Sequence, residues 1–121
     1  MRIGVLTGGG DCPGLNSVIQ AIVLRAARYG FEVWGIEDGY KGLIEGRARP
    51  LRNEDVKGIH FVGGTILGTS RKNPAKSEED MTKVMDNVRK LGLDALIAIG
   101  GDDTLGAALK LYQRGLPIVG V

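Results

Sequence analysis

Four short and mostly apolar runs recur along the chain, and each is rich in β-branched side chains. They are residues 3–6, 31–36, 95–99 and 117–121. Continuous rather than alternating apolarity is typical of strands that are covered on both faces, as in parallel sheets. The pattern therefore predicts four buried strands.

Between these runs, apolar residues return with the spacing of an amphipathic helix. The three predicted helices are 16–29, 77–91 and 104–113. A glycine suited to ending a helix follows each of them, at Gly30, Gly92 and Gly115. Ser77, with Asp80 three residues later, resembles a capping box at the start of the second helix.

Strands and helices alternate along most of the chain. This order predicts an α/β fold with an open parallel sheet and helices on both faces, of the Rossmann-like type. Residues 37–76 are irregular except for a short strand expected near Ala48–Leu51. Because a connection of this length is usually functional, we expect it to contribute to a site.

Length and composition limit the classes of function that the chain can have. The chain has 121 residues, enough for one domain, with 43% hydrophobic and 25% charged residues. A net charge of +2 gives no indication of a nucleic-acid partner or a membrane surface. No apolar run approaches the roughly 20 residues of a membrane span. The single cysteine, Cys12, allows no internal disulfide, which fits a cytoplasmic protein.

A glycine-rich stretch, "TGGGDCPGLN" at 7–16, joins the first predicted strand to the first helix. Backbone amides in such a loop approach phosphate closely, and the helix dipole adds to the attraction. Two familiar phosphate motifs fail here. Pro13 replaces the third glycine of the dinucleotide fingerprint, and Leu15 and Asn16 replace the Lys and Ser/Thr of the Walker A motif. An ordinary strand–helix turn is the alternative interpretation.

A second candidate is "GTSRKNPAK" at 68–76, where Arg71, Lys72 and Lys76 cluster among small residues before a helix. Arginine offers phosphate a planar fork and lysine offers a point charge. Taken alone, the stretch is also compatible with a solvated basic loop.

The third candidate is "IAIGGDDTLG" at 97–106. Asp102 follows two glycines at the carboxyl end of a predicted buried strand, where α/β enzymes bind ligands. Carboxylate oxygens suit Mg²⁺, which proteins commonly hold by one or two carboxylates together with substrate phosphates. The alternative is that Asp102 and Asp103 only cap the helix together with Thr104.

Taken together, "GVLTGGGDCPGLN", "DGYKGL", "GGTILGTSR" and "IGGDDTLGAA" resemble the 6-phosphofructokinase family, in the same order and over nearly all of the chain. The family transfers a phosphoryl group to the 1-hydroxyl of fructose 6-phosphate. The resemblance implies that residues 1–121 are part of the phosphoryl-donor-binding domain. It also implies Mg²⁺ as cofactor, and a homo-oligomer, dimer or tetramer, for the full-length protein.

The resemblance further implies a donor site. Its residues are Gly10, Tyr40, Arg71, Lys72, Gly101, Asp102, Asp103 and Thr104. Gly10 is expected against the donor phosphates, and Arg71 is expected as a phosphate ligand with a catalytic role. Asp102 is expected to hold Mg²⁺.

Asp103 is expected to select the donor. ATP-using members of the family normally have glycine at this position, whereas the pyrophosphate-using branch typically has aspartate. A carboxylate here would occupy the place of the α-phosphate of ATP and repel it, while pyrophosphate would fit. The resemblance thus favours pyrophosphate as donor. Three alternatives stay open: an ATP-dependent 6-phosphofructokinase, an enzyme similar to NAD kinase, and a non-enzymatic phosphate-binding module.

Two features of the 6-phosphofructokinase family are expected to have no counterpart in residues 1–121. The strand at 117–121 has no loop after it, so we expect the sequence to be a fragment, with the aspartate general base in a motif after Val121. Gln20 and Leu24 stand where the allosteric members have arginines. Allosteric control by nucleotide or phosphoenolpyruvate is therefore not expected.

Overall fold

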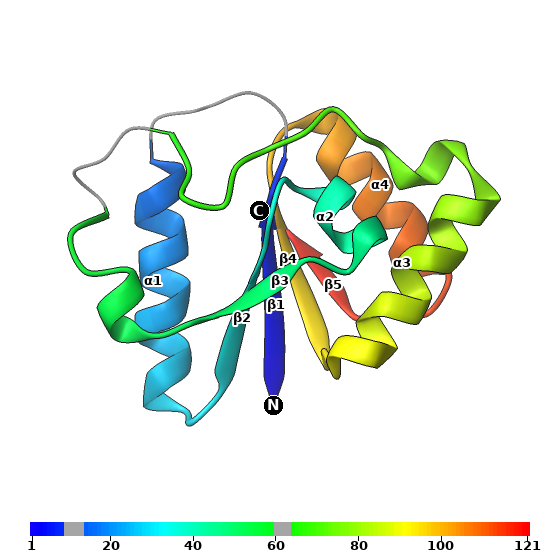
Figure 1. The fold of residues 1–121 in the computed structure, drawn as a ribbon. Coiled ribbons are helices and arrows are strands. Elements are labelled where there is room, and N and C mark those ends of the chain that lie inside the picture. The colour runs from blue at the N-terminus through cyan, green and yellow to red at the C-terminus, as the bar shows by residue number, and fades with distance from the viewer. Residues whose placement is uncertain (9–13, 60–63) are drawn as a thin grey trace.

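Five strands form one sheet in the computed structural model, which describes residues 1–8, 14–59 and 64–121 (Figure 1). The strands are β1 (Arg2–Thr7), β2 (Glu32–Ile36), β3 (Ala48–Leu51), β4 (Ala95–Ile99) and β5 (Ile118–Gly120). Their order across the sheet is β3-β2-β1-β4-β5. β1 pairs in parallel with β2 and β4, and β4 pairs in parallel with β5. The predicted open α/β sheet is confirmed.

One strand departs from the predicted parallel arrangement. β3 is antiparallel to β2, with Val33 opposite Leu51 and Ile36 opposite Ala48. A parallel pair needs a crossover of about a dozen residues or more. Residues 37–47, which join β2 to β3, are too few for one, so the chain turns back and forms an antiparallel edge.

Helices cover both faces of the sheet, as predicted (Figure 1). α1 (Leu15–Arg28) packs on one face, and α2 (Tyr40–Glu45), α3 (Glu78–Leu91) and α4 (Asp102–Gln113) lie on the other. Two single-turn 3-10 helices, η1 (Asn53–Asp55) and η3 (Pro74–Lys76), lie in the long connection. No helix in the described ranges has the length and apolarity needed to cross a membrane.

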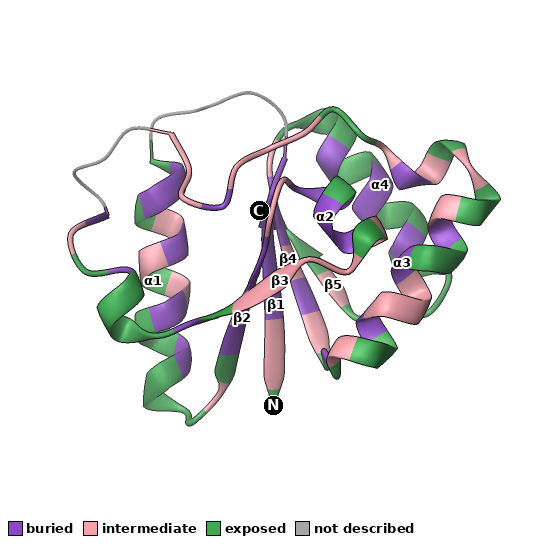
Figure 2. Cartoon of the chain, in the orientation of Figure 1, coloured by how far each residue is buried: buried purple, intermediate pink, exposed green. Residues whose placement is uncertain are grey.

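Strands β1, β2 and β4 are largely apolar because each contributes buried side chains to two cores. Side chains alternate between the faces of a strand. In β1, Val5 belongs to the cluster under α1 and Leu6 to the cluster under the other helices, and both are fully buried. Figure 2 shows this burial along the central strands and on the helix faces that pack against them. The predicted two-sided burial is therefore confirmed for β1, β2 and β4 and is wrong for β5, an edge strand in which Val119 is 62% exposed.

The predicted ends of α3 are confirmed, but the capping box is only half formed, because the N–H of Ser77 donates to the carbonyl oxygen of Pro74 and not to Asp80. The Ser77 hydroxyl accepts a hydrogen bond of 3.3 Å from the backbone N–H of Asp80. Gly92 ends the helix in the left-handed conformation, with φ of 68°. Both contacts pair backbone groups that a helix end otherwise leaves without partners.

Helix α2 was not predicted, and its formation depends on packing. The amide of Asn87 in α3 donates to the carbonyl oxygens of Leu43 and Ile44, at 2.9 and 2.8 Å. Gly42 lies so close to Glu37 that a Cβ atom would overlap the Glu37 carbonyl oxygen. The short helix thus requires a glycine inside it and a partner outside it.

We expect the substitution Gly42→Ala to lower the free energy of unfolding by roughly 1–3 kcal/mol, the usual cost of forcing an extra methyl group into a packed region. Gly106→Ala is the matched control. Gly106 also lies within a helix, α4, but has open space around it. There alanine should stabilise by up to about 1 kcal/mol. Denaturation of the two variants measures both effects, and equal shifts would contradict this account of α2.

Candidate functional site

The carboxyl ends of β1 and β4 lie next to each other, with Thr7 opposite Ile99. The pairing continues past the strands, because the N–H of Gly8 donates to the carbonyl oxygen of Ile99 at 2.8 Å. Ligands of open α/β sheets bind outside the carboxyl ends of strands. The two glycine-rich segments identified in the sequence therefore leave the sheet from neighbouring strands.

The side chain of Thr104 packs between these two segments and is 5% exposed. A Cβ atom on Gly8 would overlap the Thr104 hydroxyl, and one on Gly100 would lie 2.7 Å from the same oxygen. Both positions therefore require glycine, because the threonine side chain occupies the space. This packing fixes the first turn of α4 against the ends of β1 and β4.

Asp102 and Asp103 are the first two residues of α4, after the N-cap residue Gly101. Both side chains are exposed, and neither carboxylate forms a hydrogen bond or an ion pair within the part of the chain that the structure describes. Neither acid caps α4 by a side-chain hydrogen bond, although both lie in its first turn, where a carboxylate interacts favourably with the helix dipole. Two free carboxylates thus stand together at the rim of the site.

The stretch 64–70 crosses the carboxyl ends of β1 and β2 (Figure 1). The side-chain oxygen of Asn16 accepts from the N–H of Ile66, and the carbonyl of Leu67 accepts from the N–H of Asp38, both at 2.8 Å. The hydroxyl of Thr7 donates to the carbonyl of Gly68 at 2.8 Å. Helix α1 and both strands therefore hold this stretch in place.

The basic residues Arg71 and Lys72 follow directly along the chain, before η3. η3, which begins three residues after Arg71, packs against α3 and α4. Arg71 is exposed and has no hydrogen bond or ion pair with any residue of the described ranges. The ammonium group of Lys72 lies 3.3 Å from the Asp80 carboxylate. Arg71 thus has an uncommitted guanidinium group, whereas Lys72 is already paired.

The structure places Tyr40 in the core, where it is 3% exposed. Its hydroxyl donates to the carbonyl oxygen of Thr104 at 2.9 Å. Burial raises the pKa of Tyr40, so the hydroxyl stays protonated and keeps its role as a donor. Tyr40 therefore reaches the site through Thr104 and exposes almost no surface of its own to a ligand.

Gly10 lies outside the described residues. Three residues that shape the site lie in the glycine-rich stretch 7–16, but the sequence pattern indicated no individual role for any of them. Thr7 and Gly8 continue a predicted strand, and Asn16 starts a predicted helix. A polar residue on the apolar stripe of a helix was the available signal for Asn16, which is 2% exposed.

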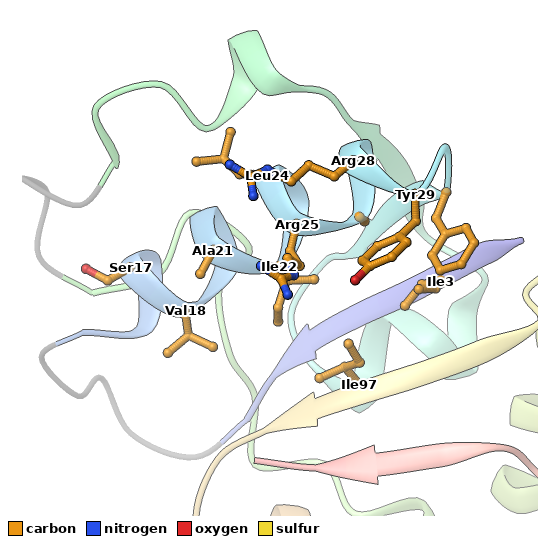
Figure 3. A pocket seen from close by; sticks show the side chains of 12 residues that line it. Ile3, Ser17, Val18, Ala21, Ile22, Leu24, Arg25, Arg28, Tyr29 and Ile97 are labelled. Carbon is orange, nitrogen blue, oxygen red and sulfur yellow. The ribbon is translucent and has the colours of Figure 1, made fainter.

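A separate groove of about 890 Å³ lies beside α1 (Figure 3). Its walls are mainly apolar and include Val18, Ile22 and Ile97. Ile97 packs with the cluster under α1, on the face of the sheet opposite α4. The groove is therefore distinct from the candidate site at the strand ends.

Comparison with known proteins identifies the family of the chain. The family model described as Phosphofructokinase matches residues 2–121. The chain belongs to the phosphofructokinase family. A pyrophosphate–fructose 6-phosphate 1-phosphotransferase from Dictyoglomus thermophilum is 60% identical over 121 residues, which are 100% of this chain and 35% of that protein.

Two further relatives extend the comparison. The ATP-dependent 6-phosphofructokinase 2 of Streptomyces coelicolor is 55% identical over 122 residues, covering 100% of this chain and 36% of that protein. The solved structure of phosphofructokinase from Saccharomyces cerevisiae superposes with a TM-score of 0.85 at 30% identity, over 99% of this chain and 19% of that one. The chain spans about a third of the length of the curated relatives it matches.

The packing of Thr104 predicts different outcomes at two adjacent glycines. Gly100→Ala should destabilise the fold by roughly 1–3 kcal/mol, because the new methyl group meets the carbonyl oxygen of Gly8 as well as Thr104. Gly101→Ala should change stability by less than about 0.5 kcal/mol, since nothing lies within 4 Å of its Cβ position. Thermal denaturation of both variants makes the comparison. A tolerant Gly100 would contradict the packing described.

Proposed function

We propose that residues 1–121 form the phosphoryl-donor-binding part of a Mg²⁺-dependent phosphofructokinase that uses pyrophosphate. The reaction transfers a phosphoryl group from pyrophosphate to the 1-hydroxyl of fructose 6-phosphate and gives fructose 1,6-bisphosphate. Family membership and the name of the Dictyoglomus relative support the reaction. The proposal includes a homo-oligomeric, cytoplasmic enzyme. It assigns donor and metal binding to this chain and assigns the general base to none of its residues.

Asp102 fits the role of magnesium ligand. Its carboxylate is exposed and is not used by any described residue. Among the residues that the structure describes, no group of three or more His, Cys, Asp or Glu could hold a metal by itself. A single carboxylate that shares the ion with substrate phosphates is the usual arrangement for Mg²⁺. When bound, the ion neutralises phosphate charge.

The choice of pyrophosphate over ATP as donor rests on Asp103. Its free carboxylate stands beside Asp102 at the rim of the site. A phosphate of a longer donor placed 4 Å from this charge would lose about 4 kcal/mol for each unit charge at an effective dielectric constant of 20. That loss corresponds to nearly three orders of magnitude in binding. Pyrophosphate, which has two phosphates, avoids it.

The remaining residues would bind and stabilise the transferring group. Amides at the start of α4, with Gly101 and Thr104, suit phosphate oxygens, as helix N-termini do. The free guanidinium of Arg71 suits the charge that spreads over the phosphoryl oxygens in the transition state. Gly10 is proposed against the same phosphates. Lys72 would contribute from its pair with Asp80, at the edge of the site.

An ATP-dependent enzyme is the second candidate, and one observation favours it. The Streptomyces relative named as ATP-dependent is 55% identical, close to the 60% of the relative named for pyrophosphate. Overall similarity therefore does not decide the donor, and the argument rests on Asp103. Membership of the phosphofructokinase family sets aside the NAD-kinase-like alternative.

The test is the rate of the full-length protein containing this sequence with each donor. We expect kcat/KM with pyrophosphate to exceed that with ATP by at least about a hundredfold, from the repulsion at Asp103. Asp103→Gly should raise kcat/KM for ATP by about ten- to a hundredfold. Asp103→Asn, which removes the charge and keeps the size, separates repulsion from steric exclusion.

Equal rates with the two donors in the unaltered protein would overturn the donor assignment, as would an Asp103→Gly variant that gains nothing with ATP. Binding of Mg²⁺–pyrophosphate without phosphorylation of the sugar would instead support the non-enzymatic binding module.

A further inference from the structure

We infer that Tyr40 is a positioning residue of the donor site, acting through its hydrogen bond to the Thr104 carbonyl. The inference rests on the function proposed above and concerns a residue whose sequence context suggested direct contact with the donor. The bond spans 64 residues of sequence and joins the start of α2 to the first turn of α4. Asp102 and Asp103 belong to that same turn.

The tyrosine is itself held on a rigid frame. It follows Gly39, whose backbone lies so close to the end of β1 that a Cβ atom would lie 2.9 Å from the Thr7 carbonyl oxygen. The other end of α2 is held by the amide of Asn87 from α3. The Tyr40 ring packs in the core cluster that includes Leu6 and Leu111. A hydroxyl placed in this way has little freedom to move.

Two different contacts therefore locate the first turn of α4. The Thr104 side chain packs against Gly8 and Gly100, which sets its distance from the sheet. The Thr104 carbonyl accepts from Tyr40, which restrains the turn from the side of α2. Displacing a catalytic group by about 1 Å costs up to about a hundredfold in rate. Holding the carboxylates of Asp102 and Asp103 in place should therefore increase the rate of the reaction.

Tyr40→Phe removes one hydroxyl and keeps the buried ring. The ring packing and the helical hydrogen bonds of α4 remain, so the fold should persist. In the full-length protein, we expect kcat/KM for pyrophosphate to fall about tenfold, which lies within the up to about hundredfold cost of misplacing a catalytic group by about 1 Å. The KM for fructose 6-phosphate should stay within about twofold, because the restraint acts on the donor side.

Tyr112→Phe is the matched control. Tyr112 lies on the same helix, α4, is 62% exposed, and loses the same hydroxyl. Its kinetics should equal those of the unaltered protein. The melting temperature of each variant, measured in parallel, shows whether a kinetic change exceeds any loss of stability.

Unchanged pyrophosphate kinetics in Tyr40→Phe would overturn the inference. A rise in the KM for fructose 6-phosphate as large as the fall in kcat/KM for pyrophosphate would also overturn it, because that would indicate a defect that is not confined to the donor side. The donor assays of the unaltered protein keep the two claims separate. If it uses ATP and not pyrophosphate, the donor assignment fails, and the same tenfold criterion then applies to ATP kinetics.

Discussion

The packing of Thr104 between Gly8 and Gly100 is the contact on which the candidate site depends. It brings the start of α4 against two neighbouring parallel strands at their carboxyl ends. Any larger side chain at either glycine would push the helix away from the sheet. The exposed polar residues of the site are then placed by a buried frame, through this packing and through the hydrogen bond from Tyr40 to the Thr104 carbonyl.

Different residues fix the position of the site and supply its charge. The residues that locate the site, Thr104 and Tyr40, are buried. The residues that we propose to act on the donor, Asp102, Asp103 and Arg71, are exposed and are not paired within the described ranges. Charges left in water need no compensation by the protein, since burying them would be costly. They stay available for a metal ion and phosphates, and the buried frame fixes where they stand.

Much of this could be predicted from the sequence because local signals agreed with the fold. The apolar runs gave the four parallel strands, and apolar stripes ended by glycine gave α1, α3 and α4. Helix α2 was missed because its six residues show no periodic stripe, and because it depends on Asn87 from another helix. By contrast, the place of Asp102 after β4 was predicted correctly, because the end of an apolar run marks the end of a strand in the sequence. Tyr40 is buried by a core cluster drawn from several elements, and its hydroxyl bonds a residue 64 positions away, so no local pattern reveals its place.

In the proposed enzyme, the first turn of α4 holds the metal-bound donor. Crystals of the full-length protein grown with Mn²⁺, a spectroscopic and anomalous substitute for Mg²⁺, and a non-hydrolysable diphosphonate test it directly. We expect an anomalous peak at bonding distance from the Asp102 carboxylate, with the diphosphonate between α4 and Arg71 and with Asp103 beyond its end. A metal and diphosphonate bound away from α4 would contradict it.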